Sequence, residues 1–141
     1  MRGIFGIDPG WGITLLRLMT AIVFIVSGSG KWAAGVAATT AGFAKVGIPA
    51  PGIAAPFIMV LELGGGILLF LGFFTRGLGL LFAVEMMVTA FYVKFPAQWW
   101  NPARIDLMLL VTGILLVIVG PGRLAVDTLW LEERVGRNDR V

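Results

Sequence analysis

Four long apolar runs, separated by short polar or glycine- and proline-rich segments, dominate the chain. They cover residues 12–30, 53–72, 76–95 and 105–120. A helix that crosses the hydrocarbon core of a bilayer needs about 20 mainly apolar residues, because it rises about 1.5 Å per residue. The runs approach or reach that length, and they end near glycine or proline, which are typical helix stops. The pattern predicts an all-α fold, an integral membrane bundle of four transmembrane helices.

The segments between the runs differ in length and character. The longest extends from Lys31 to Pro51, and its scattered apolar residues in an Ala, Gly and Thr background favour an interfacial amphipathic helix or a re-entrant segment. The second and third runs are joined so tightly that we expect an antiparallel hairpin. We expect the transmembrane domain to occupy residues 1–123 and a polar, charge-mixed tail to occupy residues 124–141.

The composition supports a lipid environment and narrows the chemistry. Of 141 residues, 58% are hydrophobic and 13% are charged, and the mean hydropathy is +0.94. Soluble domains carry roughly 45–50% apolar and about 25% charged residues, so four buried elements of a soluble core are a poor alternative. The sequence contains neither cysteine nor histidine. Thiol chemistry, iron–sulfur ligation and the usual zinc sites are therefore excluded, we expect no metal site, and the chain alone is not a self-sufficient redox enzyme.

The basic residues lie mainly beside the apolar runs, although the net charge is +3 and the pI about 10. This distribution is typical of a membrane protein that faces anionic lipid, and it does not predict nucleic-acid binding. With an even number of spans, both termini lie on one side, together with Arg2, Arg76, Arg123, Arg134, Arg137 and Arg140. The opposite side carries Lys31, Lys45, Lys94 and Arg104. The larger basic count predicts cytoplasmic termini.

Four ionisable residues stand out within the runs, because a charge near the bilayer centre costs a few kcal/mol and marks a candidate functional site. They are Arg17 in the first run, Glu62 in the second, Glu85 in the third and Asp106 at the start of the fourth. Depth arguments pair Arg17 with Glu62, as either a clamp or an active site, and Lys31 with Asp106 as a structural ion pair. Glu85 has no obvious cation at its depth. We expect this unexplained intramembrane acid to be protonated or to lie in a hydrated cavity, and it is the first candidate for proton handling.

Two further features are a pair of tryptophans near a span end and a run of glycines that follows Glu62. Trp99 and Trp100 resemble an aromatic anchor in the headgroup region, and a ligand platform is the alternative. The run from Gly64 to Gly66 permits close helix packing, and the alternative is a flat cavity beside Glu62.

The order of several motifs resembles the DoxX family of small bacterial membrane proteins, from about Leu15 to Leu129. The similarity rests on Arg17, Gly28-x-x-Lys31, Phe43, Gly47-Ile48-Pro49, Glu62 with Gly64-Gly65, Gly72-x-x-Thr75-Arg76, Asp106, Gly120-Pro121-Gly122-Arg123 and Asp127. The resemblance implies a four-helix fold in the bacterial inner membrane. It also implies associations with thiosulfate–quinone oxidoreductases and with membrane anchors of redox or detoxification assemblies. Glu85 is outside this pattern.

Three functions remain open at this point. The first is a membrane subunit of a quinone-linked oxidoreductase, with Arg17 and Glu62 as the polar site and Gly65, Trp99 and Trp100 beside a quinone or lipid. The second is a non-catalytic structural or assembly subunit of a larger membrane complex. A small-solute carrier comes last, because no internal repeat is evident. We expect the lipid bilayer and other membrane or redox subunits as partners, and a homo-oligomer is also compatible with the sequence.

Overall fold

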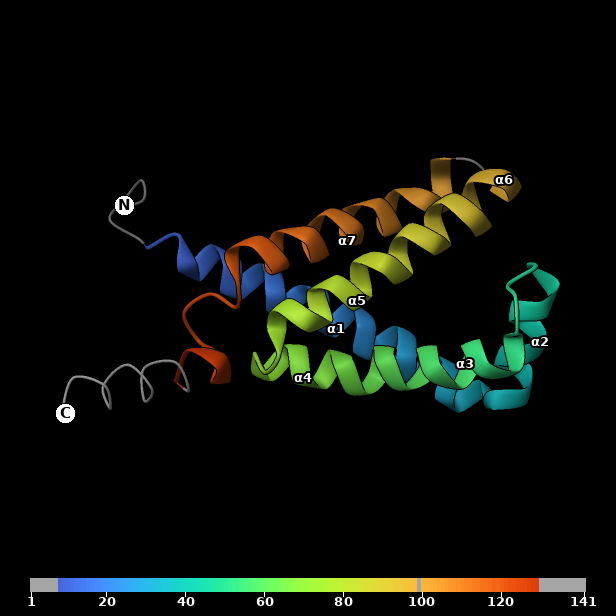
Figure 1. Cartoon of the computed structure of the whole chain (residues 1–141), viewed down its shortest axis with the longest axis horizontal. Helices are drawn as coiled ribbons and strands as arrows, with labels where there is room; N and C mark the ends of the chain where they lie inside the picture. Colours follow the sequence, from blue (N-terminus) through green and yellow to red (C-terminus); the bar gives the residue numbers. More distant parts are fainter. Residues whose placement is uncertain (1–7, 99, 130–141) are drawn as a thin grey trace.

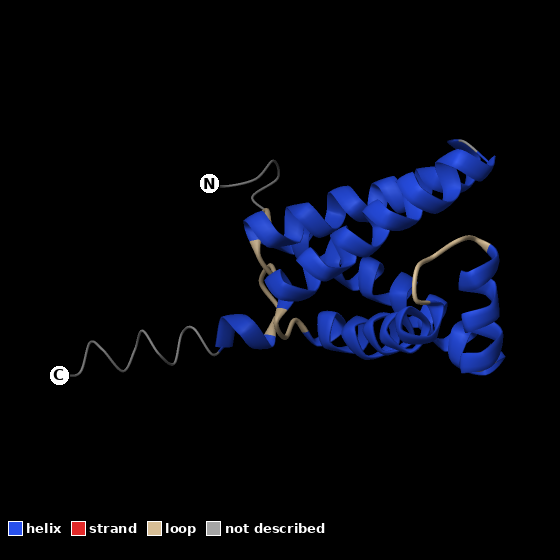
Figure 2. Cartoon of the chain, turned by 45° about the vertical axis from the view of Figure 1, so that its right-hand side comes forward, coloured by secondary structure: helices blue, strands red, loops and turns tan. Residues whose placement is uncertain are grey.

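The computed structural model describes residues 8–98 and 100–129, and every regular element among them is helical (Figures 1 and 2). The elements are α1 (Gly10–Ala34), α2 (Val36–Lys45), α3 (Pro51–Val60), the π-helical turn η2 (Leu61–Gly65), α4 (Gly66–Leu71), α5 (Thr75–Val88), the π-helical turn η3 (Thr89–Lys94), α6 (Phe95–Gln98) and α7 (Trp100–Val119).

In the part of the chain that the structure describes, four helices are long and apolar enough to cross a membrane, which confirms the predicted fold class. They comprise Gly10–Ala34, Pro51–Leu71, Thr75–Ala97 and Trp100–Val119. The fourth helix begins at Trp100, earlier than predicted. Pro102 does not prevent this start, because it lies in the first turn, where the missing N–H of proline costs no helical hydrogen bond. Large apolar side chains are exposed on all four helices, as expected for faces that contact lipid.

The four helices form two pairs, in which α1 packs against α3, η2 and α4, while α5 packs against α7. Figures 1 and 2 show that the two pairs lie close together near α4 and the start of α5 and separate toward the end that carries α2 and α6. Near the converging end, a salt bridge joins Asp8 to Arg123, so the two ends of the described chain share one face of the bundle.

Small residues and one aromatic stack hold the pairs together. A Cβ on Gly79 would lie 2.9 Å from the Gly113 carbonyl oxygen, so only glycine allows this approach of α5 and α7. Between the pairs, the rings of Phe24 and Phe82 stack with centroids 3.7 Å apart. This stack joins the two helix pairs, which separate toward the end that carries α2 and α6.

The longest connection contains α2, which packs on α3 and α1 and buries only Thr39. Its placement at the membrane interface stays a prediction. Residues 124–129, the start of the predicted tail, are tied to the bundle: Ala125 is buried, and the Asp127 amide donates a hydrogen bond to the Gly72 carbonyl. The rest of the predicted tail lies outside the described residues.

Candidate functional site

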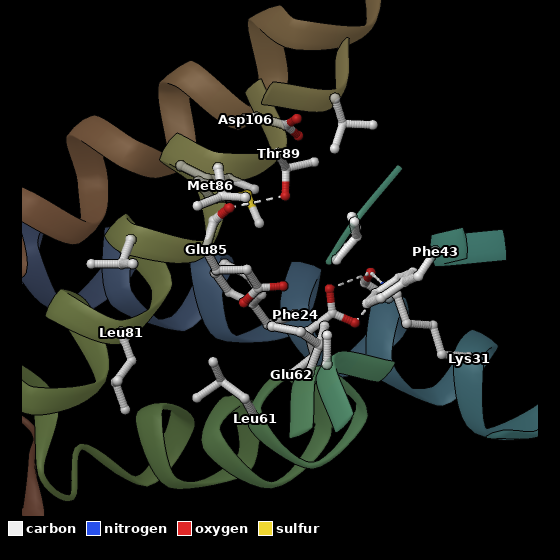
Figure 3. A pocket seen from close by; sticks show the side chains of 18 of the residues that line it. Phe24, Lys31, Phe43, Leu61, Glu62, Leu81, Glu85, Met86, Thr89 and Asp106 are labelled. Atoms are coloured by element: carbon white, nitrogen blue, oxygen red, sulfur yellow. Dashed lines mark hydrogen bonds and ion pairs between the residues drawn. The ribbon is translucent and has the colours of Figure 1, made fainter. Parts of the chain in front are cut away.

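A cavity of about 550 Å³ lies between the two helix pairs. Its walls are mostly apolar and come from α1, the 43–48 segment, α3, η2, α5, η3 and α7 (Figure 3). Five charged side chains line it: Lys31, Glu62, Glu85, Lys94 and Asp106. An apolar cavity of this size with a few convergent polar groups is the usual form of a small-molecule site. We refer to it as the polar cavity.

Glu62 sits in a closed set of hydrogen bonds with two residues of α1. Its Oε2 atom is 2.5 Å from Lys31 Nζ, and the Ser27 hydroxyl donates to its Oε1 atom at 3.1 Å. Lys31 Nζ also donates to Ser27 Oγ at 2.9 Å. Ser27 and Lys31 are four residues apart and so share one face of α1. Gly28, between them, lets η2 come close, because a Cβ there would lie 2.6 Å from the Leu63 amide nitrogen.

Asp106 has a different cation, Lys94, the last residue of η3. Lys94 Nζ lies 2.8 Å from both carboxylate oxygens and donates a well-directed hydrogen bond to Oδ1. In both ion pairs the acid is inside and the lysine reaches outward: the side chains of Glu62 and Asp106 are 4% and 7% exposed, those of their lysines 26% and 32%. In each pair the lysine is therefore the more exposed partner.

Glu85, from the middle of α5, extends into the same space (Figure 3). It is 9% exposed, and its Oε2 atom has no hydrogen-bond partner among the described residues. It interacts electrostatically with Glu62, Lys31 and Asp106. The carboxyl group thus faces two ion pairs while having no salt bridge of its own among the described residues.

The predicted Arg17–Glu62 pair is wrong. Arg17 donates hydrogen bonds to three carbonyls at the opposite end of the bundle, those of Pro121 at 2.7 Å, Phe70 at 3.4 Å and Leu124. The reason is distance along α1: Arg17 precedes Ser27, which contacts Glu62, by ten residues, or roughly 15 Å of helix.

The predicted Lys31–Asp106 pair is also wrong, since Lys31 binds Glu62 and Asp106 binds Lys94. Lys31 and Asp106 belong to different helix pairs, which have separated at this end of the bundle. Each acid is instead neutralised within its own helix pair, which shortens the distance that a lysine must reach.

Arg17 belongs to a second polar region, which we call the terminal clamp: Arg17, Asp127 and the backbone groups that they bind. Asp127 accepts hydrogen bonds from the backbone amides of Phe74 and Thr75, both at 2.8 Å, at the start of α5. Free amides at a helix N-terminus favour an anionic acceptor. The clamp therefore joins the turn between the second and third spans to the segment that follows the fourth span.

Gly65 does not line the polar cavity. A Cβ on it would lie 3.1 Å from Leu78 and 3.2 Å from Phe82, so it serves packing, and the predicted flat cavity beside Glu62 is not formed by this glycine. Trp100 is 55% exposed and also lies outside the cavity lining. Trp99 lies outside the described residues. Among the described residues, no three potential ligands from His, Cys, Asp and Glu gather closely enough to hold a metal ion.

Ser27 and Lys94 are the site residues that sequence reasoning missed. The spacing of Ser27 and Lys31 on one helical face was an available signal for the first. Lys94 reads in the sequence as an ordinary interfacial lysine at a span end, and only the geometry of η3 directs it to Asp106.

These features define a small polytopic membrane protein with a polar cavity between two helix pairs. The family model described as DoxX matches residues 12–95, and the chain belongs to the DoxX family.

Three relatives extend the match over most of the chain. The Bacillus subtilis protein named "Putative oxidoreductase CatD" is 38% identical over 116 residues, which cover 82% of this chain and 84% of that protein. "Inner membrane protein YqjF" of Escherichia coli is 34% identical over 122 residues, covering 84% of this chain and 91% of that protein. "Inner membrane protein YphA", also of Escherichia coli, is 32% identical over 123 residues, covering 82% and 87%. No solved structure matches the chain. With its four apolar helices and these relatives, the chain is an inner membrane protein.

Proposed function

We propose that this chain is the membrane subunit of a quinone-linked oxidoreductase, and that the polar cavity binds the quinone headgroup. The observation that carries the proposal is the cavity itself, in which apolar walls surround the Glu62–Lys31 pair. Its volume of about 550 Å³ lies within the 300–1,000 Å³ that is usual for ligand pockets. The oxidoreductase name of one relative supports the reaction class.

Each cavity residue has a role that its chemistry permits. The Lys31 ammonium donates hydrogen bonds and orients a quinone carbonyl, while the Phe24 ring offers an apolar wall. Reduction of a quinone to a quinol consumes two electrons and two protons. The electrons come from a partner redox subunit, because this chain contains no cysteine or histidine to hold a metal centre. Glu62, which is paired with Lys31, takes up a proton and passes it to the reduced carbonyl oxygen.

The test is extraction of the protein in patches of native membrane, followed by mass spectrometry of bound quinones and copurified proteins. We expect stoichiometric quinone and a redox enzyme with the wild type, and loss of quinone in Glu62→Gln. Asp8→Asn is the matched control, since it makes the same acid-to-amide change on an exposed side chain outside the cavity.

A protein that carries only phospholipid and no redox partner would overturn the proposal. That outcome would favour the non-catalytic structural or assembly subunit, in which the polar cavity only stabilises the fold.

A further inference from the structure

Glu85 is an acid of the polar cavity to which the proposed function gives no role. Its backbone position in the middle of the third span places it deeper than Lys94, nine residues later, by roughly 13 Å of helix. The side chain is directed into the cavity rather than into lipid (Figure 3). A carboxyl group at that depth is costly unless something compensates for the lost water.

The three acids of the cavity are not equivalent. Glu62 and Asp106 are each within 2.8 Å of a lysine nitrogen and so carry their negative charge beside a cation. Glu85 has no salt bridge among the described residues, and one of its oxygens is buried without a hydrogen-bond partner. A carboxyl that faces other carboxylates in an apolar cavity is stabilised by holding a proton.

We propose that Glu85 is a proton-carrying catalytic residue, which takes protons from water at the open end of the cavity, beside Lys94 and Asp106, and delivers them to the ligand at Glu62. This inference rests on the proposed function in one respect: the proposed function identifies the quinone as the molecule that accepts the protons. The groups that act electrostatically on Glu85 are Glu62 and Lys31 from the first helix pair and Asp106 from the second, and Lys94 lines the same cavity.

The route lies within the cavity, because Glu62, Glu85, Thr89, Lys94 and Asp106 all line it. At about 30 Å³ of liquid volume per molecule, the cavity has room for several waters between the acids. For each quinone, two electrons arrive from the partner and two protons leave Glu85, one after the other. After each transfer, the Glu85 carboxylate is reprotonated from water at the open end, so charge and atoms balance.

The first experiment uses the protein in lipid nanodiscs without any ligand and records the infrared C=O stretch of neutral carboxylic acids at pH 7. We expect one such band in the wild type that shifts rapidly in D₂O, because the cavity admits water. The band should be absent in Glu85→Gln and displaced in Glu62→Gln. It should persist in Met86→Leu, a volume-conserving change on the same cavity wall.

A wild-type protein without the band, or a band that persists unchanged in Glu85→Gln, would overturn the proposal. Because the wild-type measurement needs no variant, a misfolded Glu85→Gln cannot hide the result. If the band behaves as expected but no quinone copurifies, the proposed function fails while the proton-carrying site stands.

The second experiment uses the whole complex with its copurified redox partner. Glu85→Gln should lower the rate of quinone reduction by 10²–10⁴-fold, the usual contribution of a positioned acid or base, while leaving quinone binding unchanged. Glu85→Asp should recover part of the rate, because it restores a carboxyl. A Glu85→Gln complex that retains the full rate would contradict the proposal.

Discussion

The terminal clamp and the polar cavity both place charged side chains inside an apolar bundle, but they treat those charges differently. In the clamp, Arg17 and Asp127 bind backbone carbonyls and amides at the ends of helices, which need such partners in any case. In the cavity, side chains bind side chains, two lysines are partly exposed, and Glu85 has a buried oxygen without a hydrogen bond. Arg17 lines neither cavity, although Asp127 borders a separate one of about 1150 Å³, whereas Glu62, Glu85 and Asp106 all line the polar cavity of about 550 Å³.

This difference separates charges that stabilise the fold from charges that are available for chemistry. A guanidinium held by fixed carbonyls has one favourable state. A carboxyl in a hydrated cavity can change its protonation state, because water and neighbouring acids can exchange protons with it. The following substitutions test that separation, from the largest expected effect on stability to the smallest.

Arg17→Met should be the most damaging change. It leaves the Pro121 and Leu124 carbonyls without their donor, and an unpaired buried group costs about 1–3 kcal/mol. We expect the free energy of unfolding in nanodiscs to fall by roughly 2–5 kcal/mol, measured by tryptophan fluorescence during denaturation. Arg76→Met, at an exposed arginine, is the control. If Arg17→Met unfolded like wild type, the clamp would not be the stabilising region.

Gly28→Ala should damage the cavity while leaving the clamp intact. The new Cβ would lie 2.6 Å from the Leu63 amide nitrogen, so η2 must move away from α1 and the Lys31–Glu62 pair must lengthen. We expect a loss of about 1–3 kcal/mol in unfolding free energy and a loss of bound quinone. Gly30→Ala, in the same helix but with open space around it, should change neither. Equal effects of the two substitutions would contradict the assigned contact.

Asp127→Asn should weaken the clamp more mildly. The amide keeps one acceptor for the Phe74 and Thr75 amides but loses the negative charge at the start of α5, which is typically stabilising by about 0.3–1 kcal/mol. We expect an unfolding free energy lower by about 1 kcal/mol and unchanged quinone content. Loss of quinone without loss of stability would link the clamp to ligand binding and remove the distinction between the regions.

Asp8→Asn should have the smallest effect, and one that depends on pH. The Gly10 backbone amide and then Arg123 hold the pKa of Asp8 below its ordinary value of 3.8. The stabilisation by the ionised form is therefore fully present above about pH 4 and is lost as the pH falls through the folded-state pKa. Wild type and Asp8→Asn should differ slightly in melting temperature at pH 7 and converge in acid. A difference that grew in acid would contradict this assignment.

The sequence was sufficient to predict the four spans, because they follow from the length of the apolar runs. The ion pairs could not be predicted in the same way. Depth was counted from expected helix ends, but the first helix extends to Ala34, and antiparallel packing brings its last turns to Glu62. Which helices separate, and where, depends on contacts such as Gly28 on η2 that no single run reveals.

The two π-helical turns affect how sequences of relatives should be aligned. A π turn holds an extra residue compared with an α-helical turn, and Glu62 lies in η2 while Lys94 lies in η3. Deleting one residue there would leave the apolar length almost unchanged but would rotate everything beyond the turn by about 100° about the helix axis. An alignment guided by hydropathy alone would accept such a gap without penalty. Single-residue gaps at these two turns therefore mark relatives in which the cavity has changed, even where the spans look identical.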